Sequence, residues 1–93
     1  AFLHYREAAS ISPNYYPAWY YCAKLLLEAN AYTQAIPYLQ KAIEIAPPKI
    51  LYAKSNAIKN LVFCFIRTGK IDEAIQLINL ELLPLKLDLA FIF

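Results

Sequence analysis

A period of 34 residues limits the fold of this chain more than any other feature of its sequence. At that spacing a pattern of small residue, large residue, small residue and proline is repeated: Ala1, Tyr5, Ala8 and Pro13 return as Ala35, Leu39, Ala42 and Pro47. Repeats of this length are typical of helical hairpins, each of which buries its apolar face against the next hairpin. The chain is therefore predicted to be all-α, with antiparallel helical hairpins stacked as a fragment of an α-solenoid.

The composition indicates a packed domain and excludes a disordered one. Hydrophobic residues make up 60% of the 93 positions and glycine occurs once, whereas disordered chains are poor in apolar residues. Because this apolarity is high for a free-standing piece, the chain is expected to be an excerpt from a longer array that works in a large or membrane-associated assembly. Glu81, Lys86 and Asp88 interrupt the apolar stretches, so no membrane-spanning segment is expected.

The spacing of apolar residues predicts helices over residues 1–11, 16–29, 33–46 and 50–68, and a further helix from residue 72. Pro13, Pro47 and Gly69 are expected to end the helices before them, because proline and glycine disfavour continuation of a helix. Asn30 is expected to take a left-handed conformation in the turn between the second and third helices.

Two side chains are expected to cap helices. Asn14 and Thr33 precede apolar helical patterns, and each carries a side-chain oxygen that can accept a hydrogen bond from a free backbone N–H group. Pro37 lies near the first turn of its helix, where a local irregularity is expected. Trp19 and Leu39 are expected to fill the core between small residues.

The segment from Tyr16 to Pro47 carries an ordered set of motif residues: Trp19, Cys22, Ala23, Leu26, Asn30, Tyr32, Ala35, Leu39, Ala42 and Pro47. This segment resembles a tetratricopeptide repeat, and "TGKIDEAI" from Thr68 to Ile75 is similar to the turn and second helix of another. Across the chain, the structural motif set that the resemblance implies is Trp19, Ala23, Ala35, Ala42, Pro47, Gly69 and Ala74.

The resemblance implies one domain, residues 1–93, with a half-repeat at 1–13, a full repeat at 14–47, a degenerate or capping repeat at 48–83 and an apolar C-terminal tail at 84–93. Ala74 lies 39 residues after Ala35, so the second repeat has a longer first helix. Ile58 stands where a tryptophan is usual, and Glu81 replaces an alanine. The tail is expected to form a short helix or an extended apolar strap.

The resemblance further implies a non-catalytic protein–protein interaction scaffold or assembly factor that docks a partner segment in a concave groove. The first helices of the repeats line this groove, which gives the candidate binding residues Tyr20, Tyr21, Lys24, Glu28, Asn56, Lys59, Asn60, Phe63 and Arg67. Helical geometry supports the grouping, because residues three or four apart share a face. An alternative is that Glu28 and Arg67 pair with each other across the two repeats.

Two other functional classes are weighed. RNA binding by a related helical repeat is the alternative function, but the net charge is only +2, and Lys49, Lys54 and Lys59 point in different directions on a helix. An enzyme would need catalytic groups, and His4 is the only histidine. No catalytic residue, metal site or cofactor is therefore expected.

Cys22 and Cys64 stand alone and without metal-binding spacing, which predicts buried, reduced thiols. They favour a reducing compartment, the cytoplasm or an organelle interior such as the plastid stroma. The abundance of Ile, Leu, Tyr, Lys and Asn would suit an AT-rich plastid genome, and tetratricopeptide repeat proteins that resemble this one help to assemble photosystem I there.

Overall fold

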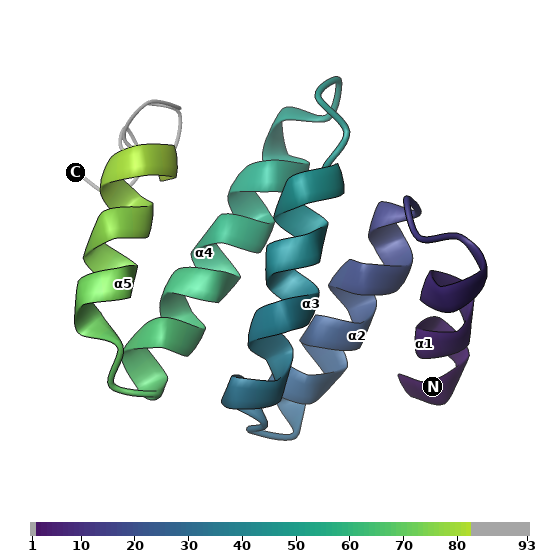
Figure 1. The fold of residues 1–93 in the computed structure, drawn as a ribbon, viewed down its shortest axis with the longest axis horizontal. Helices are drawn as coiled ribbons and strands as arrows, with labels where there is room; N and C mark the ends of the chain where they lie inside the picture. Colours follow the sequence, from purple (N-terminus) through teal and green to yellow (C-terminus); the bar gives the residue numbers. More distant parts are fainter. Residues whose placement is uncertain (1, 83–93) are drawn as a thin grey trace.

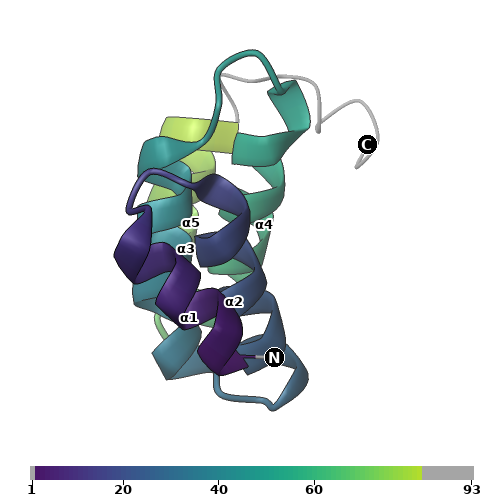
Figure 2. The same ribbon diagram turned by 90° about the vertical axis from the view of Figure 1, so that its right-hand side faces the viewer.

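The computed structural model describes residues 2–82, whose helices follow one another in antiparallel order. They are α1 (Phe2–Ile11), α2 (Tyr16–Glu28), α3 (Tyr32–Ile45), α4 (Leu51–Arg67) and α5 (Ile71–Leu77), which continues into a π-helical turn, Ile78–Leu82. Figure 1 shows these helices side by side in chain order. Turned by 90°, Figure 2 separates them into two layers, with α1, α3 and α5 in one and α2 and α4 in the other. The predicted all-α solenoid is confirmed.

The turns inside the two repeats share one backbone geometry. Asn30 (φ 60°) ends the first and Gly69 (φ 79°) the second, both in the left-handed region as predicted. In each turn the next residue donates its N–H to a carbonyl five positions back, Ala31 to Leu26 at 2.8 Å and Lys70 to Phe65 at 2.7 Å. This pattern satisfies the free carbonyls at a helix end and reverses the chain.

The predicted side-chain caps at Asn14 and Thr33 were wrong. Helix α2 follows Tyr15 and α3 follows Ala31, and neither start has a side-chain capping hydrogen bond. Ser12 accepts a backbone bond from Tyr15 at 3.0 Å, which places Asn14 inside a turn ahead of the cap position. The left-handed residue before Ala31 starts α3 early, so Thr33 lies within its first turn.

Pro37 does not break its helix, and the local irregularity expected there takes the form of one missing backbone hydrogen bond. Helix α3 continues through this proline from Tyr32 to Ile45. Proline removes one backbone donor, which leaves the carbonyl of Thr33 without its usual partner. Both residues are exposed, so water can satisfy that carbonyl and the helix continues unbroken.

Small side chains form the centre of the core. Ala23, Ala35 and Ala42 have no exposed surface, and Ala74 is 2% exposed. These alanines let helix backbones approach closely, and the larger side chain of Leu39, also fully buried, fills the space between them. Trp19, in contrast, is only partly buried, so its predicted place in the core was wrong.

The second repeat departs from the first at its two ends. Helix α4 has 17 residues against 13 in α2, and Ile58 is fully buried. Glu81 replaces an alanine and lies in the π-helical turn, where its Oε2 is 3.3 Å from Nζ of Lys54. The longer helix therefore supplies the partner that a carboxylate needs at this position. The predicted tail at 84–93 lies outside the described residues.

None of the helices found in residues 2–82 is long and apolar enough to cross a membrane.

Leu39→Ala should lower the free energy of unfolding by about 2–5 kcal/mol, because it leaves a cavity among residues that cannot close it. Leu3→Ala is the matched control, since Leu3 is 71% exposed, and it should change stability by less than about 0.5 kcal/mol. Urea unfolding followed by far-ultraviolet circular dichroism measures both. Equal losses in the two variants would contradict the described core.

Candidate partner-binding groove

An open cleft of about 400 Å³ lies between α2 and α4. Its walls come from α2 and from the start of α4: Tyr16, Pro17, Tyr20, Tyr21, Lys24, Ile50, Tyr52, Ala53 and Asn56. Four predicted groove residues, Tyr20, Tyr21, Lys24 and Asn56, are thus brought together in one cleft. The cleft is named here the tyrosine cleft.

Side-chain hydrogen bonds tie the two helices together beneath the tyrosine cleft. The Tyr16 hydroxyl donates to the carbonyl oxygen of Ala53 at 2.6 Å, and Nδ2 of Asn60 donates to the Tyr20 hydroxyl at 3.1 Å. The rings of Tyr16 and Tyr20 stack with their centroids 5.5 Å apart. Asn60, predicted to face a partner, is therefore already engaged in holding Tyr20, and the wall of the cleft is preorganised.

Burial raises the pKa of Tyr16 to about 12, and the nearby hydroxyls of Tyr20 and Tyr21 act in the same direction. A phenolate at this position would lose hydration and could no longer donate to Ala53. The Tyr16 hydroxyl therefore stays protonated and keeps its hydrogen bond throughout the neutral range.

The other end of α4 carries an aromatic and cationic cluster. The guanidinium carbon of Arg67 lies 5.4 Å from the ring centroid of Tyr32 and 5.6 Å from that of Phe63, and the two rings meet edge to face at 5.7 Å. Arg67 and Glu28, both among the described residues, form no ion pair, so the alternative that they pair was wrong. Stacking on two rings holds the guanidinium instead.

The remaining predicted residues lie apart from the tyrosine cleft. Glu28 and Lys59 are exposed on α2 and α4, and Phe63 is 45% exposed on α4. A second open cleft begins at Arg67 and is lined by the turn between α2 and α3. Four residues of the predicted set therefore line the tyrosine cleft and Arg67 lines the second cleft, whereas the other four line neither.

Tyr16, Ile50 and Tyr52 line the cleft but are not among the binding residues expected from the sequence. Tyr52 is 69% exposed and lies one turn before Asn56, so the four-residue spacing that grouped Asn56 with Asn60 extends to it. Tyr16 has the same relation to Tyr20. Ile50 precedes α4, and no helical periodicity could have placed it in the cleft.

The thiols of Cys22 and Cys64 are buried and unpaired with each other. Burial raises the pKa of both, and the charge of Arg6 only partly offsets this at Cys22. Thiols of this kind are poor nucleophiles at neutral pH. Within residues 2–82, no group of His, Cys, Asp or Glu side chains could hold a metal ion.

Paired antiparallel helices, a repeated left-handed turn and a cleft between successive first helices define a helical-repeat protein of the α-solenoid class. A family model described as tetratricopeptide repeat matches residues 1–55 and, in a second overlapping match, residues 26–82. The chain therefore belongs to the tetratricopeptide repeat family. A search of curated proteins gave no match. Repeats of this family generally mediate protein–protein interaction, and the family is typically non-catalytic.

The raised pKa of Tyr16 predicts a loss of stability at high pH. The folded chain holds this proton until about pH 12, whereas an unperturbed tyrosine releases it near 10.0. The stabilisation that protonated Tyr16 contributes is therefore complete below pH 10.0 and is lost as the pH rises from there to about 12. Urea unfolding across this range should show that the free energy of unfolding falls less for Tyr16→Phe than for the unchanged chain. Tyr52→Phe, at an exposed position, should retain the full fall; equal behaviour of the two variants contradicts the assignment.

Proposed function

We propose that this chain is a non-catalytic scaffold or assembly factor that docks an extended segment of another protein along α2 and α4. The observation that carries the proposal is the tyrosine cleft, where aromatic, amide and cationic side chains of successive repeats line one open surface. Tyr16 lines this cleft and has a raised pKa, but its protonated hydroxyl is already bonded to the carbonyl oxygen of Ala53, so it is poorly placed to act as a general acid or base. The cleft offers contact surface and hydrogen bonds instead.

The side chains of the cleft fit a polypeptide ligand. Tyr21 (43% exposed) and Tyr52 present flat apolar faces that order with little loss of side-chain entropy. The Asn56 amide can donate to and accept from a peptide backbone at once. Lys24 is exposed at the wall and favours an acidic residue in the partner.

The length of α4 sets the length of the partner segment. Tyr52, Asn56, Phe63 and Arg67 follow one another at helical spacing along this helix. The 15-residue step from the first to the last corresponds to about 22 Å of helix. An extended chain of about seven residues covers that distance. The proposed ligand is therefore a short linear segment that begins at the tyrosine cleft and reaches the cluster around Arg67.

Site-specific photocrosslinking tests this proposal. A benzoylphenylalanine residue at position 21, in the full-length protein within its own cell extract, should give discrete crosslinked products. Lys24→Glu combined with Arg67→Glu should reduce their yield about tenfold, because both charges would repel an acidic partner. The crosslinker at position 44, an exposed site on α3, is the control. The same crosslinked products from positions 21 and 44 would contradict the proposal.

The RNA-binding alternative predicts a different measurement. A fluorescent single-stranded RNA of about 20 nucleotides should show no saturable anisotropy change with this chain at physiological salt, since the net charge is only +2. Binding tighter than about 1 μM that weakens steeply with added salt would favour RNA as the ligand instead. A fluorescent peptide, titrated over the same range of concentrations of this chain, serves as the reference.

A further inference from the structure

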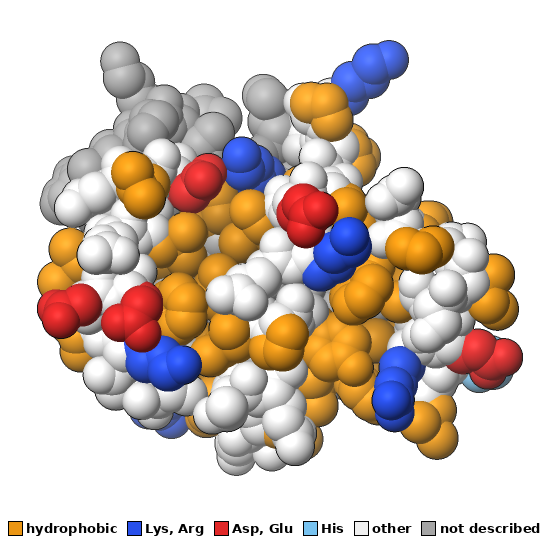
Figure 3. Space-filling model, in the orientation of Figure 1, with side chains coloured by type: hydrophobic (Ala, Val, Ile, Leu, Met, Phe, Trp, Pro, Cys, Tyr) orange, Lys and Arg blue, Asp and Glu red, His pale blue; other side chains and the backbone are white. Residues whose placement is uncertain are grey.

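Another pocket lies between α1 and α3, on the layer opposite to that of α2 and α4. Figure 3 looks onto this layer and shows apolar side chains exposed in hollows on either side of α3. The hollow toward α1 has a volume of about 160 Å³ and is lined by Arg6, Ala9, Ser10, Trp19, Pro37 and Tyr38. None of these residues lines the tyrosine cleft.

Two aromatic rings form the pocket in fixed positions. The indole Nε1 of Trp19 donates to the carbonyl oxygen of Pro13 at 2.8 Å, which sets the orientation of the ring. The Trp19 and Tyr38 centroids are 5.7 Å apart at a tilt of 44°, and Phe2 packs edge to face against Tyr38 at 5.9 Å. The aromatic walls are therefore held by their neighbours before any ligand arrives.

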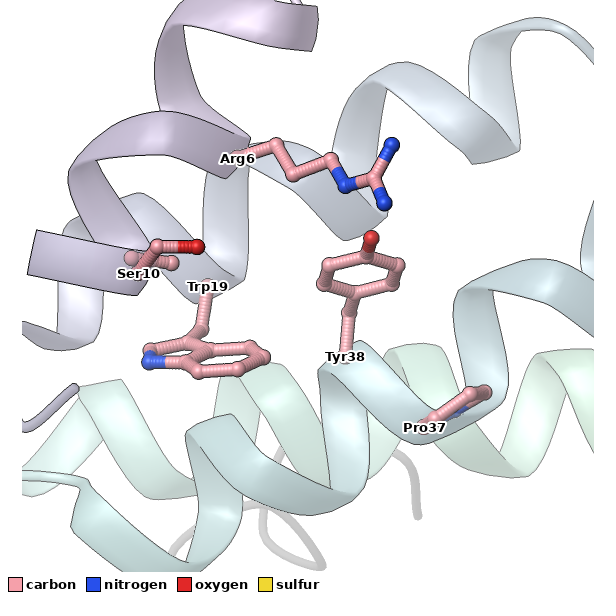
Figure 4. Close-up of a pocket in the computed structure, with 6 residues that line it drawn as sticks. Arg6, Ser10, Trp19, Pro37 and Tyr38 are labelled. Atoms are coloured by element: carbon pink, nitrogen blue, oxygen red, sulfur yellow. The ribbon is translucent and has the colours of Figure 1, made fainter.

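Polar groups converge at the edge of this pocket. Figure 4 shows Arg6 extending from α1 toward the hydroxyl end of Tyr38, with Ser10 on the same side of the indole. Within residues 2–82 the Arg6 side chain makes no ion pair and no hydrogen bond, and the hydroxyls of Ser10 and Tyr38 have no hydrogen-bond partner. A guanidinium without a counter-charge beside an apolar pocket favours a carboxylate at that edge.

The equivalent hollow in the next repeat does not have the same lining residues. The hollow between α3 and α5 is lined by Gln40, Ile43 and Leu77 among others, which occupy the positions equivalent to Arg6, Ala9 and Tyr38. A cation, a methyl group and an aromatic ring are thus replaced by an amide and two aliphatic side chains. The hollow beside Ile43 is the larger of the two, at about 330 Å³ against 160 Å³, so the pocket beside Ala9 differs from it by its cation and its aromatic rings.

We infer that the pocket between α1 and α3 is a second docking site, which takes an aromatic side chain followed by an acidic residue from a partner protein. A cavity of about 150 Å³ holds one benzene ring, and a pocket of about 160 Å³ has room for a single phenyl group. Trp19 and Tyr38 supply ring contacts, and the Arg6 guanidinium pairs with the adjacent carboxylate. The site shares no lining residue with the tyrosine cleft, so the two can be occupied together.

Trp19 reports directly on occupancy, because it is the only tryptophan of the chain. The probe is the blocked peptide Ser-Gly-Phe-Asp-Glu-Gly-Ser, which adds no tryptophan emission. Titration should change the emission of Trp19 saturably. Peptides with Ala in place of Phe, or with Lys-Lys in place of Asp-Glu, should bind about tenfold more weakly, since each lacks half of the recognised chemistry.

Two variants and one control distinguish specific binding in this pocket from non-specific binding of the peptide. Arg6→Glu should reverse the preference, so that the Lys-Lys peptide binds better than the Asp-Glu peptide. Ala9→Ile should abolish binding by filling the pocket, with circular dichroism showing that the helices persist. Lys49→Glu, an equal charge change at an exposed site outside both surfaces, should leave the titration unchanged.

Three results would overturn the inference. One is an emission that stays constant up to millimolar peptide. Another is an Arg6→Glu variant that behaves like Lys49→Glu. The third is free 3-phenylpropionate binding as tightly as the peptide, which would assign the pocket to a small aromatic acid instead of a protein segment.

Discussion

The close approach of helix backbones at buried alanines is the interaction on which the rest of the structure depends. Ala23, Ala35 and Ala42 expose no surface, and each presents only a methyl group to its neighbours. Any larger side chain at these positions would push α2 and α3 apart, because protein interiors leave no unused space to absorb it. Ala23 and Ala35 also belong to the core cluster that includes Leu61 and Cys64 of α4, so their packing joins α2, α3 and α4 beneath the layer that carries the tyrosine cleft.

The second repeat shows what happens when this constraint is relaxed. Glu81 takes the place of a small residue, and a carboxylate is costly to bury without a partner. The chain leaves α-helical geometry at Ile78 for a π-helical turn, and from this turn the carboxylate of Glu81 reaches Lys54 on α4. Such a partly exposed pair contributes about 0–1 kcal/mol. It satisfies the charge, but it does not replace the packing that an alanine would allow.

The sequence predicts those features that depend on neighbours along the chain. Period and apolar spacing were enough for the helices, and the left-handed turns at Asn30 and Gly69 follow from residue types that tolerate positive φ. The predicted caps were wrong because turn geometry decides where a helix starts, and that geometry depends on backbone hydrogen bonds from Tyr15 to Ser12 and from Ala31 to Leu26. Asn14 lies one position before the cap position of its helix and Thr33 lies two positions after, and neither makes a capping hydrogen bond.

The candidate site was harder to predict for a related reason. Helical spacing groups residues on one helix, so Lys24 and Asn56 were found, but it does not say which side chains engage each other across two helices. Arg67 packs on two aromatic rings and does not pair with Glu28, and Asn60 donates a hydrogen bond to Tyr20. These outcomes depend on distances between helices, which the sequence pattern does not contain.

The two-layer arrangement gives the chain two surfaces that differ in what they can recognise. On the α2 and α4 layer, tyrosines and an amide line a long open cleft, suited to several residues of a peptide backbone. On the α1 and α3 side, a single ring-sized pocket lies under one cation. Because Trp19 belongs to α2 but faces the second pocket, the same helix contributes to both surfaces, and a shift of α2 would alter the two together.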